Sequence, residues 1–349
     1  MRALTVLPGV ANSVRLDEVP EPPLSEGSIL ARAITLGVCG TDREILAGEY
    51  GSAPAGQERL ILGHESLGRV EEAPPDSGLA PGDLIVGFVR HPDPVPCPAC
   101  AAGEWDMCLN GKYTEHGIKA RNGFGAELFR IEPEFAIKVD PGLDKLGVLI
   151  EPTSVVAKAW DHIDAIGRRS RSWLPKTVLV TGAGPIGLLA ALIGVQRGLD
   201  VFILDRNATG LKPELAHGLG AKYHTSDVSA LDFQPDILIE CTGAVPVITG
   251  ALQRVAPSGI VCLAGVTAAG RLAEIDVGAL NRTLVLNNQV VFGSVNGNRL
   301  HYEEAARALA KADKDWLGRL ISRRVPMESW PEALEHRRGD IKVVIDIAA

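Results

Sequence analysis

Residues Thr177–Gly187 read TVLVTGAGPIG, and this stretch decides the fold of the second half of the chain. The β-branched run before Gly182 is typical of a short buried strand, and the apolar segment Leu188–Val195 that follows is typical of a packed helix. Gly182, Gly184 and Gly187 keep the G-x-G-x-x-G spacing across the junction. Such a turn lets the backbone approach a pyrophosphate, whose charge the start of the helix favours. The alternative is an ordinary strand–turn–helix.

A second strand-like run, Val201–Leu204, supports the nucleotide interpretation because it ends in Asp205, about twenty residues beyond the glycines. An acid at this place accepts hydrogen bonds from an adenosine ribose, so the two features together predict a dinucleotide site. The acid favours NAD, because it pairs with the ribose 2′-hydroxyl and repels a 2′-phosphate. Arg206 retains a positive charge beside it, before Asn207, so NADP is expected to be tolerated.

Length and composition set the broad class. The chain has 349 residues, enough for two domains, with 46% hydrophobic and 22% charged residues, as in an ordinary globular protein. A formal net charge of −8 argues against a nucleic-acid or anionic-membrane partner. The uncharged stretch between Lys176 and Arg197 contains Gly-Ala-Gly-Pro, which argues against a membrane span. No secretory signal is evident, so the expected location is cytoplasmic.

The pattern of apolar runs and of Pro- and Gly-rich breaks changes near residue 153. Before it, short alternating runs such as 29–36 and 84–89 are separated by Pro- and Gly-rich breaks, which predicts strands and turns. A helix is predicted over 153–166, followed by a basic connector, 168–172. Beyond the connector, strands alternate with helical segments, which predicts an α/β fold with a parallel sheet. The expected strands are 178–181, 201–204, 237–241, 260–264 and 290–293, and the tail adds a helix over 303–312 and a strand over 342–347.

Three stretches of the first half carry metal-type side chains. Cys39 lies among glycines, His64 stands beside Glu65, and Glu151 interrupts an apolar run before Pro152. Each alone has an ordinary structural interpretation. Together they supply a thiolate, an imidazole and carboxylates, which suit a catalytic zinc with one position left open.

These residues resemble a known family. Gly37-x-Cys39-Gly-Thr-Asp42, Gly63-His-Glu65, Pro81-Gly-Asp83 and Gly182-Ala-Gly-Pro-Ile-Gly187 occur in the order found in zinc-dependent medium-chain dehydrogenases/reductases. Residues 40–50, 113–118 and 292–296 are similar to the glucose 1-dehydrogenases first met in archaea. Those enzymes oxidise β-D-glucose, and often other aldoses, at C1 to the lactone with NAD or NADP.

The resemblance implies the fold and the ligand set. A GroES-like, β-rich catalytic domain is expected over 1–152 and 297–349, and a Rossmann dinucleotide-binding domain over 153–296. Cys39 and His64 would ligate zinc, Glu65 would do so directly or through water, and Glu151 would be a further ligand or a contact to substrate and water. Zinc would stabilise the alkoxide of the anomeric hydroxyl during hydride transfer to the nicotinamide.

The resemblance also implies roles in binding and proton transfer. Thr41 would be the first member of a proton relay, while its alternative interpretation is a helix cap before Asp42. Glu115 and Asn296 would bind the sugar hydroxyls, and Asn296 would also lie near the nicotinamide. His301 and His116 are weaker candidates, and His116 is interpreted as a packing residue. The full set expected to contact the cofactor is Gly182, Gly184, Pro185, Ile186, Gly187, Asp205, Arg206, Asn207, Thr242, Gly243, Gly265 and Asn296.

A second metal site is less complete. Cys97, Cys100 and Cys108 match the last three of four cysteines in the structural-zinc lobe of the family, while Pro94 occupies the first position. Asp93, or else His91, would have to supply the fourth ligand, because zinc accepts both side chains. The alternative is a metal-free lobe with three thiols.

The functional alternatives are a zinc dehydrogenase of another sugar or polyol, a zinc-free quinone or enone reductase, and a non-enzymatic NAD(P)H-binding protein. The resemblance further implies a homodimer or homotetramer formed through the Rossmann domain. No nucleic-acid or membrane partner is expected.

Overall fold

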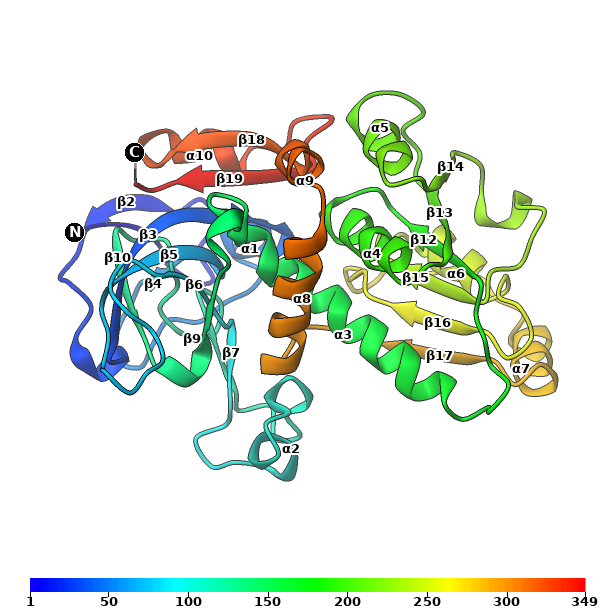
Figure 1. Cartoon of the computed structure of the whole chain (residues 1–349), viewed down its shortest axis with the longest axis horizontal. Coiled ribbons are helices and arrows are strands. Elements are labelled where there is room, and N and C mark those ends of the chain that lie inside the picture. Colours follow the sequence, from blue (N-terminus) through cyan, green and yellow to red (C-terminus); the bar gives the residue numbers. More distant parts are fainter. Residues whose placement is uncertain (349) are drawn as a thin grey trace. The chain divides into compact units, whose positions relative to one another are not determined.

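The computed structural model describes residues 1–348, which form two compact units. One unit comprises Met1–Ser154 together with the segment that begins at Asn296, and the other comprises Val155–Val295. The chain therefore leaves the first unit once, builds the second from a continuous segment, and returns (Figure 1).

The first unit is organised around β3 (Ile29–Val38), a ten-residue strand that pairs antiparallel with three others. Its odd and even positions are both largely buried, as expected for a central strand covered on both faces. The sheet order is β11-β6-β5-β3-β19-β18, with β10 also paired to β3. These strands are β5 (Glu65–Glu72), β6 (Leu84–Gly87), β10 (Leu128–Ile131), β11 (Ala136–Lys138), β18 (Ile321–Pro326) and β19 (Lys342–Asp346).

The C-terminal tail completes this sheet. Strand β19 pairs antiparallel with β3, with Val343 opposite Val38 and Ile345 opposite Leu36. Figure 1 shows the red C-terminal strands alongside the blue N-terminal ones. Three helices precede or follow β18, namely α8 (Arg299–Lys311), α9 (Lys314–Leu320) and α10 (Trp330–Leu334). The tail is thus an integral part of the first unit.

Two small sheets and two short helices complete the first unit. One sheet has the order β2-β1-β4 and the other β7-β8-β9. Their strands are β1 (Arg2–Val6), β2 (Arg15–Glu18), β4 (Leu60–Ile61), β7 (Arg90–His91), β8 (Thr114–His116) and β9 (Ala120–Arg121), and the helices are α1 (Gly40–Leu46) and α2 (Pro98–Ala101).

The second unit holds a six-stranded parallel sheet of order β14-β13-β12-β15-β16-β17. The strand order reverses between β12 and β15, and ligands of open α/β sheets bind at the carboxyl end of such a switch point. The strands are β12 (Thr177–Thr181), β13 (Asp200–Leu204), β14 (Lys222–His224), β15 (Ile237–Glu240), β16 (Ile260–Leu263) and β17 (Val290–Gly293). The α/β class and the parallel sheet are confirmed, and β14 is a strand that the sequence did not predict.

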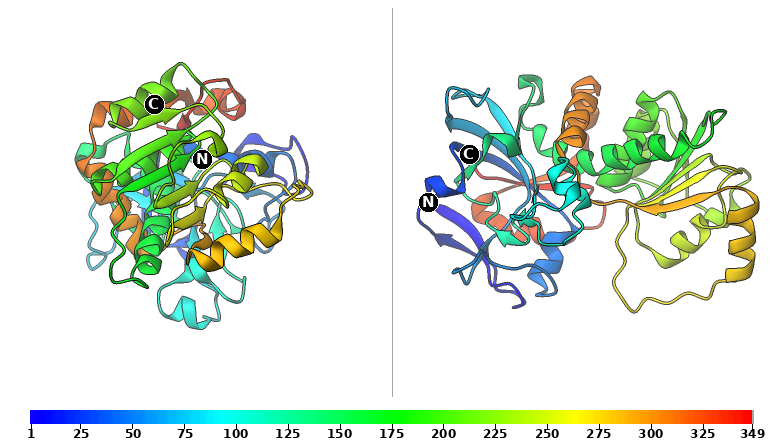
Figure 2. Two further views of the ribbon diagram at one scale, coloured as in Figure 1. Left: turned by 90° about the vertical axis from the view of Figure 1, so that its right-hand side faces the viewer. Right: turned by 90° about the horizontal axis from the view of Figure 1, so that it is seen from below.

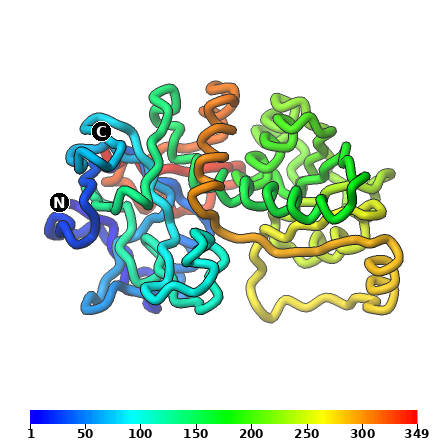
Figure 3. The backbone as a smooth tube through the Cα atoms, turned by 60° about the horizontal axis from the view of Figure 1, so that its bottom comes forward, coloured from blue at the N-terminus to red at the C-terminus, as the bar shows by residue number. Residues whose placement is uncertain are grey.

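Helices flank this sheet (Figure 2). They are α4 (Pro185–Gln196), α5 (Leu211–Gly218), α6 (Val245–Ala251) and α7 (Val277–Leu286), with α3 (Ile150–Gly167) leading in from the first unit. Helix α4 is apolar on all sides, as expected for a helix that is buried against its neighbours, and it packs on β12 and β13. The indole N–H of Trp160 in α3 donates to Ala190 O of α4 (3.2 Å). An extended segment, yellow in Figure 3, connects β16 to α7.

Within residues 1–348, no helix combines the length and the apolar character needed to cross a membrane.

Candidate functional site

Three of the predicted metal-type side chains come together in the first unit. Cys39 follows β3 directly and caps α1, Glu65 is the first residue of β5, and His64 immediately precedes that strand. Their ligand atoms all lie within 4.8 Å of one another, and Cys39 Sγ is 3.0 Å from His64 Nε2. His64 and Glu65 are buried and Cys39 is half-buried. The group therefore offers a thiol, an imidazole and a carboxylate toward one point.

The pairing of β3 with β5 positions the carboxylate of this group. Gly37 lies opposite Glu65 in the ladder, and a Cβ atom at Gly37 would fall 1.8 Å from Glu65 Oε2. The missing side chain thus creates the space that the Glu65 carboxylate occupies. Gly37 belongs to a sequence motif, but only the register of β3 and β5 explains why a glycine is needed at this position.

Asp42 orients His64 from behind. Its Oδ2 accepts the Cys39 backbone N–H (2.8 Å), and its Oδ1 lies 3.4 Å from His64 Nδ1. A carboxylate against the second ring nitrogen fixes the tautomer of a metal-binding histidine. This contact with His64 was not predicted from the sequence, where Asp42 appears only in a motif and at the start of a helix. Cys39, and not Thr41, is the N-cap of α1, so the capping interpretation of Thr41 is wrong; Thr41 donates its backbone N–H to Cys39 Sγ (3.3 Å).

Lys342 is a component of the group that the sequence did not predict. It lies on β19, its side chain is fully buried, and its Nζ contacts Glu65 Oε2 and donates to Val38 O (3.0 Å). Burial alone lowers the pKa of Lys342, but Glu65 and Cys39 outweigh this effect and raise it. One carboxylate oxygen of Glu65 is therefore in contact with a buried ammonium group.

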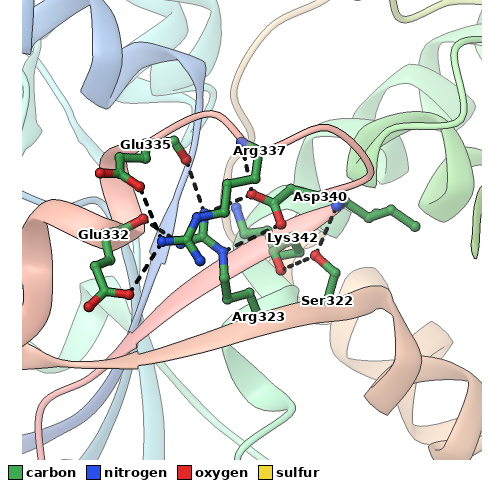
Figure 4. A network of polar contacts seen from close by, with 8 residues as sticks. Ser322, Arg323, Glu332, Glu335, Arg337, Asp340 and Lys342 are labelled. Atoms are coloured by element: carbon green, nitrogen blue, oxygen red, sulfur yellow. Dashed lines mark hydrogen bonds and ion pairs between the residues drawn. The ribbon is translucent and has the colours of Figure 1, made fainter.

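A polar network fixes the strand pair that carries Lys342 (Figure 4). Ser322 Oγ donates to Lys342 O (3.1 Å) and accepts the N–H of Ile341 (2.9 Å). Arg323 pairs with Asp340 (2.7 Å), two residues before the start of β19. These contacts span the register shift between β18 and β19 and hold Lys342 in place.

Glu151 adds a third carboxyl group to this region, beside Asp42 and Glu65. It lies in the first turn of α3 and is buried. Burial, and then repulsion by Glu65, raise the pKa of Glu151 to about 7. Its carboxyl group can therefore hold or release a proton near neutral pH.

The donor set fits a zinc ion. Thiolate sulfur, imidazole nitrogen and carboxylate oxygen are its usual ligands, and three protein ligands leave a position open at a catalytic site. The potential at the group also favours a cation. Burial lowers the pKa of His64, but Cys39 and Asp42 outweigh it and raise the pKa well above the usual value.

Glu115 and Asn296 lie together in the same unit. Asn296 Nδ2 donates to Glu115 Oε1 (3.1 Å), and both side chains are buried. Asn296 has a left-handed backbone (φ 61°), and its Oδ1 accepts the N–H of Gly297 (2.8 Å). Arg90 also donates to Glu115 Oε1 (3.0 Å), so one carboxylate oxygen already has two protein donors.

The network continues beyond these two residues. Arg90 donates to Asp106 O (3.1 Å), and Asn298 Nδ2 donates to Asp106 Oδ1 (3.0 Å). His301 lies next to Asn298, with its Nδ1 accepting the Asn298 N–H (3.1 Å). Sequence reasoning missed Arg90, Asp106 and Asn298, because no local pattern marks a buried polar network. His116 packs on Phe124 as interpreted, with ring centroids 4.4 Å apart.

The second cysteine group forms without the predicted fourth ligand. Among residues 1–348, the cluster of ligand atoms contains Cys97, Cys100 and Cys108 alone. The oxygens of Asp93 accept from Val95 N (2.9 Å) and Asn110 Nδ2 (2.8 Å), and the ring of the alternative ligand, His91, packs on Phe135 and His116. The N–H groups of Cys100 and Leu109 lower the pKa of Cys97 to about 6.

The glycine turn of the second unit has the geometry of a phosphate-binding turn. Gly182 has φ 90° and donates to Leu204 O (2.7 Å), Gly184 is the N-cap of α4, and Pro185 occupies its first turn, before Ile186. A Cβ at Gly187 would lie 1.8 Å from Gly182 O. The turn lies at the carboxyl end of β12, at the switch point of the sheet.

Two further loops follow neighbouring strands. Asp205 directly follows β13, and its oxygens accept from Ala183 N, Asn207 and Lys212. The fully buried Glu240 is the last residue of β15, and its carboxylate accepts the N–H groups of Thr242 (2.7 Å) and Gly243 (3.1 Å) in the loop that follows. The backbone N–H of Gly265 donates to Glu240 O (2.9 Å). Sequence reasoning missed Glu240, although an acid closing an apolar strand is a visible signal. Gly243 also lines a pocket with Val266 and Thr267.

Comparisons with known proteins agree with this architecture. Residues 25–141 match the alcohol dehydrogenase GroES-like domain, and residues 144–347 match the glucose dehydrogenase C-terminus. The chain is 39% identical over 360 residues to glucose 1-dehydrogenase of Methanocella arvoryzae, covering 100% of both chains. It is 40% identical over 354 residues to glucose 1-dehydrogenase of Thermoproteus tenax, covering 99% of each.

A solved structure is similar over the whole length. The Haloferax mediterranei glucose dehydrogenase in complex with NADP, Zn and gluconolactone superimposes with a TM-score of 0.92 at 31% identity, and 100% of each chain is covered. The family models, the curated relatives and the fold thus agree. The chain belongs to the zinc-dependent medium-chain dehydrogenases/reductases, within their glucose 1-dehydrogenase branch.

Proposed function

We propose that this protein oxidises an aldose at C1 to the lactone, with NAD(P) as hydride acceptor, and that D-glucose is its main substrate. The observation that carries the proposal is the cluster of Cys39, His64 and Glu65 in the same unit as the polar pair Glu115–Asn296. Relatives named glucose 1-dehydrogenase cover the whole chain, and a similar structure contains NADP, zinc and gluconolactone.

In this proposal Cys39, His64 and Glu65 hold the catalytic zinc, with Glu151 as a further ligand or a contact to substrate and water. A zinc ion there supplies Lewis-acid stabilisation of negative charge on the anomeric oxygen. Asp42 orients His64, and Lys342 holds one oxygen of Glu65. A second zinc at Cys97, Cys100 and Cys108, with Asp93 as its fourth ligand, remains a prediction.

The remaining site residues bind substrate and move a proton. The Thr41 hydroxyl is proposed to be the first member of a proton relay, which accepts the proton of the anomeric hydroxyl while it passes its own proton on, because it lies in the first turn of α1, two residues after Cys39. Glu115 and Asn296 are proposed to pair with sugar hydroxyls. A site with fixed polar partners discriminates strongly against analogues that lack a hydroxyl, because its buried groups then lose their hydrogen bonds.

The second unit is proposed to be the dinucleotide-binding domain and the first unit the catalytic domain. The pyrophosphate would lie on the turn from Gly182 to Gly187, at the start of α4. Asp205, Arg206 and Asn207 would surround the adenosine ribose, while Thr242, Gly243 and Gly265 would line the remainder of the dinucleotide.

We also propose a homodimer or homotetramer formed through the second unit. Strand β17 is an edge strand, and α7 has no buried residue although it carries apolar side chains. Val277, Val285 and Leu286 of this helix are 63–70% exposed. A second copy of the chain would cover this apolar face. The cytoplasmic location stays a prediction.

A panel of sugars tests the proposed reaction. Initial rates of reduced nicotinamide formation are measured for aldoses and polyols with NAD and with NADP. The proposal predicts turnover of D-glucose and weaker turnover of aldoses that differ at one hydroxyl. Turnover confined to polyols would replace the aldose assignment, and no turnover with any sugar would contradict the proposal.

A further inference from the structure

A buried cation lies opposite Glu115 in a small sheet of the first unit. Arg90 on β7 is the ladder partner of Glu115 on β8, and directly opposed residues carry their side chains on the same face. The guanidinium Nε donates to Glu115 Oε1 (3.0 Å), and the two side chains are 8% and 5% exposed. Moving either partner of a buried ion pair leaves an uncompensated charge, so the pair keeps its geometry.

Arg90 is itself held by two further groups. Its second donor nitrogen, Nη1, donates to Asp106 O (3.1 Å), and its guanidinium carbon lies 3.7 Å from the centroid of the Tyr113 ring. A planar guanidinium that stacks on an aromatic ring and donates from two nitrogens is fixed in orientation. The Glu115 carboxylate is therefore held in place before any ligand binds.

Asp106 connects Arg90 to the second donor of Glu115. Its backbone O accepts from Arg90, and its Oδ1 accepts from Asn298 Nδ2 (3.0 Å). Asn298 lies two residues beyond Asn296, which donates to Glu115 Oε1 (3.1 Å). One buried residue thus contacts Arg90 directly and restrains the segment that carries Asn296.

The two donors leave the oxygens of Glu115 unequal. Arg90 and Asn296 both donate to Oε1, and within residues 1–348 no side chain or backbone N–H donates to Oε2. A carboxylate oxygen offers about two lone-pair sites, so Oε1 is occupied and Oε2 is left to accept. An ionised carboxylate accepts hydrogen bonds and donates none. Oε2 therefore suits a hydroxyl group of a ligand and not an ether or carbonyl oxygen.

We propose that Arg90 is a positioning residue for sugar binding, which holds Glu115 as a carboxylate and confines its recognition of the sugar to hydroxyls that reach Oε2. Arg90 acts through Glu115 and not on the sugar itself. The loss of Arg90 should consequently fall on particular positions of the sugar ring. This proposal rests on the proposed function in taking Glu115 as a sugar contact.

Steady-state kinetics of the zinc-loaded protein tests this role. The substrates are D-glucose and its monodeoxy analogues, each lacking one hydroxyl other than that at C1, and analogues that turn over too slowly are measured as competitive inhibitors. The proteins are the wild type, Arg90→Gln, Arg90→Lys and, as a matched control, Arg121→Gln on β9, where Arg121 pairs with Thr114 and Glu132.

Arg90→Gln is expected to raise the KM for D-glucose roughly 10- to 100-fold, the size of one hydrogen bond to a charged group, and to leave kcat within about threefold. For an analogue that lacks a hydroxyl bound at Oε2, the same change should cost less than about threefold, while the other analogues keep the full loss. Arg121→Gln should stay within about threefold of the wild type for every sugar.

Arg90→Lys carries the same test if Arg90→Gln is too unstable to purify. Lysine keeps the cation but lacks the planar fork that contacts Glu115 and Asp106 together. It is expected to show a smaller rise in KM with the same dependence on the missing hydroxyl.

A loss that is equal, within about threefold, for D-glucose and for every analogue would overturn the inference, because a merely structural role of Arg90 acts on the whole site. Wild-type KM values in the Arg90 variants would also overturn it. Either result, with normal turnover of D-glucose by the wild type, leaves the proposed function standing. A wild type that does not turn over D-glucose would overturn the proposed function and this inference together.

Discussion

The contact between Lys342 and Glu65 involves a carboxylate that is proposed to ligate zinc, so we expect Lys342 and a metal ion to compete for it. Lys342 Nζ contacts Glu65 Oε2, while the ligand atoms of Glu65, Cys39 and His64 lie within 4.8 Å of one another. A buried cation beside a metal site opposes a second cation, and it stabilises the carboxylate while the metal is absent. Lys342 should therefore both support the metal-free protein and limit the affinity for zinc.

Lys342→Met is accordingly expected to bind zinc at least about tenfold more tightly and to lose roughly 3–5 kcal/mol of stability when metal-free, because Glu65 then stays buried without its partner. Competition with a chromophoric chelator measures the affinity, and urea unfolding of the metal-free protein measures the stability. Lys342→Arg, which keeps the charge, is the control. Unchanged or weaker zinc binding in Lys342→Met would contradict this account.

Glu151 makes the stability of the metal-free protein depend on pH. Its pKa rises from an ordinary value of 4.5 to about 7 on folding, so the folded state binds the proton more tightly than the unfolded state. The contribution to stability is complete below pH 4.5 and is lost as the pH rises through 7. The shift corresponds to roughly 3 kcal/mol.

Glu151→Gln removes this titration. The metal-free variant is expected to gain stability relative to the metal-free wild type on going from pH 4.5 to pH 8, by up to about 3 kcal/mol. Urea midpoints across this range provide the measurement. Parallel pH profiles for the two proteins would show that Glu151 does not titrate in this window.

The turn between β12 and α4 is the element that carries cofactor binding. A Cβ at position 187 would lie 1.8 Å from Gly182 O, so the turn cannot accept a side chain there without moving. Gly187→Ala should weaken NADH and NADPH binding by more than about tenfold, while the zinc content stays at the wild-type level. Gly318→Ala in α9, where a Cβ meets no atom within 4 Å, is the matched control. Normal cofactor binding by Gly187→Ala would exclude the turn from the site.

The elements that the sequence predicted are those with strong local patterns. Five predicted runs became β12, β13, β15, β16 and β17, and each observed strand agrees within one residue at either end. Strand β14 was missed because Lys222–His224 is short and polar, and its pairing with β13 alone defines it. Helix α3 begins at Ile150, before the predicted start, because Pro152 is tolerated in a first turn.

The candidate site divides in the same way. Cys39, His64 and Glu65 were predictable because short motifs contain them, and the structure brings their ligand atoms together. Lys342 could not be predicted, because a lysine at the start of a strand resembles an exposed residue until β19 pairs with β3. The contact between Lys212 and Asp205 could not be predicted either, because only the fold of the loop after β13 brings the two residues together.

The whole molecule presents an apolar surface that a single copy leaves exposed. Helix α7 has Val285 64% exposed and Leu286 63% exposed, and β17 offers an unpaired edge in the same unit. Light scattering after gel filtration should show a dimer or tetramer for the wild type. Val285→Glu should shift the protein to a smaller species, because it places a charge in the interface, whereas Leu174→Glu in the loop before β12 should not. A monomeric wild type would contradict the proposal.

The zinc dependence of D-glucose oxidation tests the central claim most directly. Turnover with NAD or NADP is measured on the purified protein, after a chelator has removed its metal, and after zinc is restored. The account predicts turnover that chelation abolishes and zinc restores, and a Cys39→Ala variant that binds NADPH or NADH normally without turnover. Undiminished turnover in the metal-free protein, or near-normal turnover by Cys39→Ala, would contradict it.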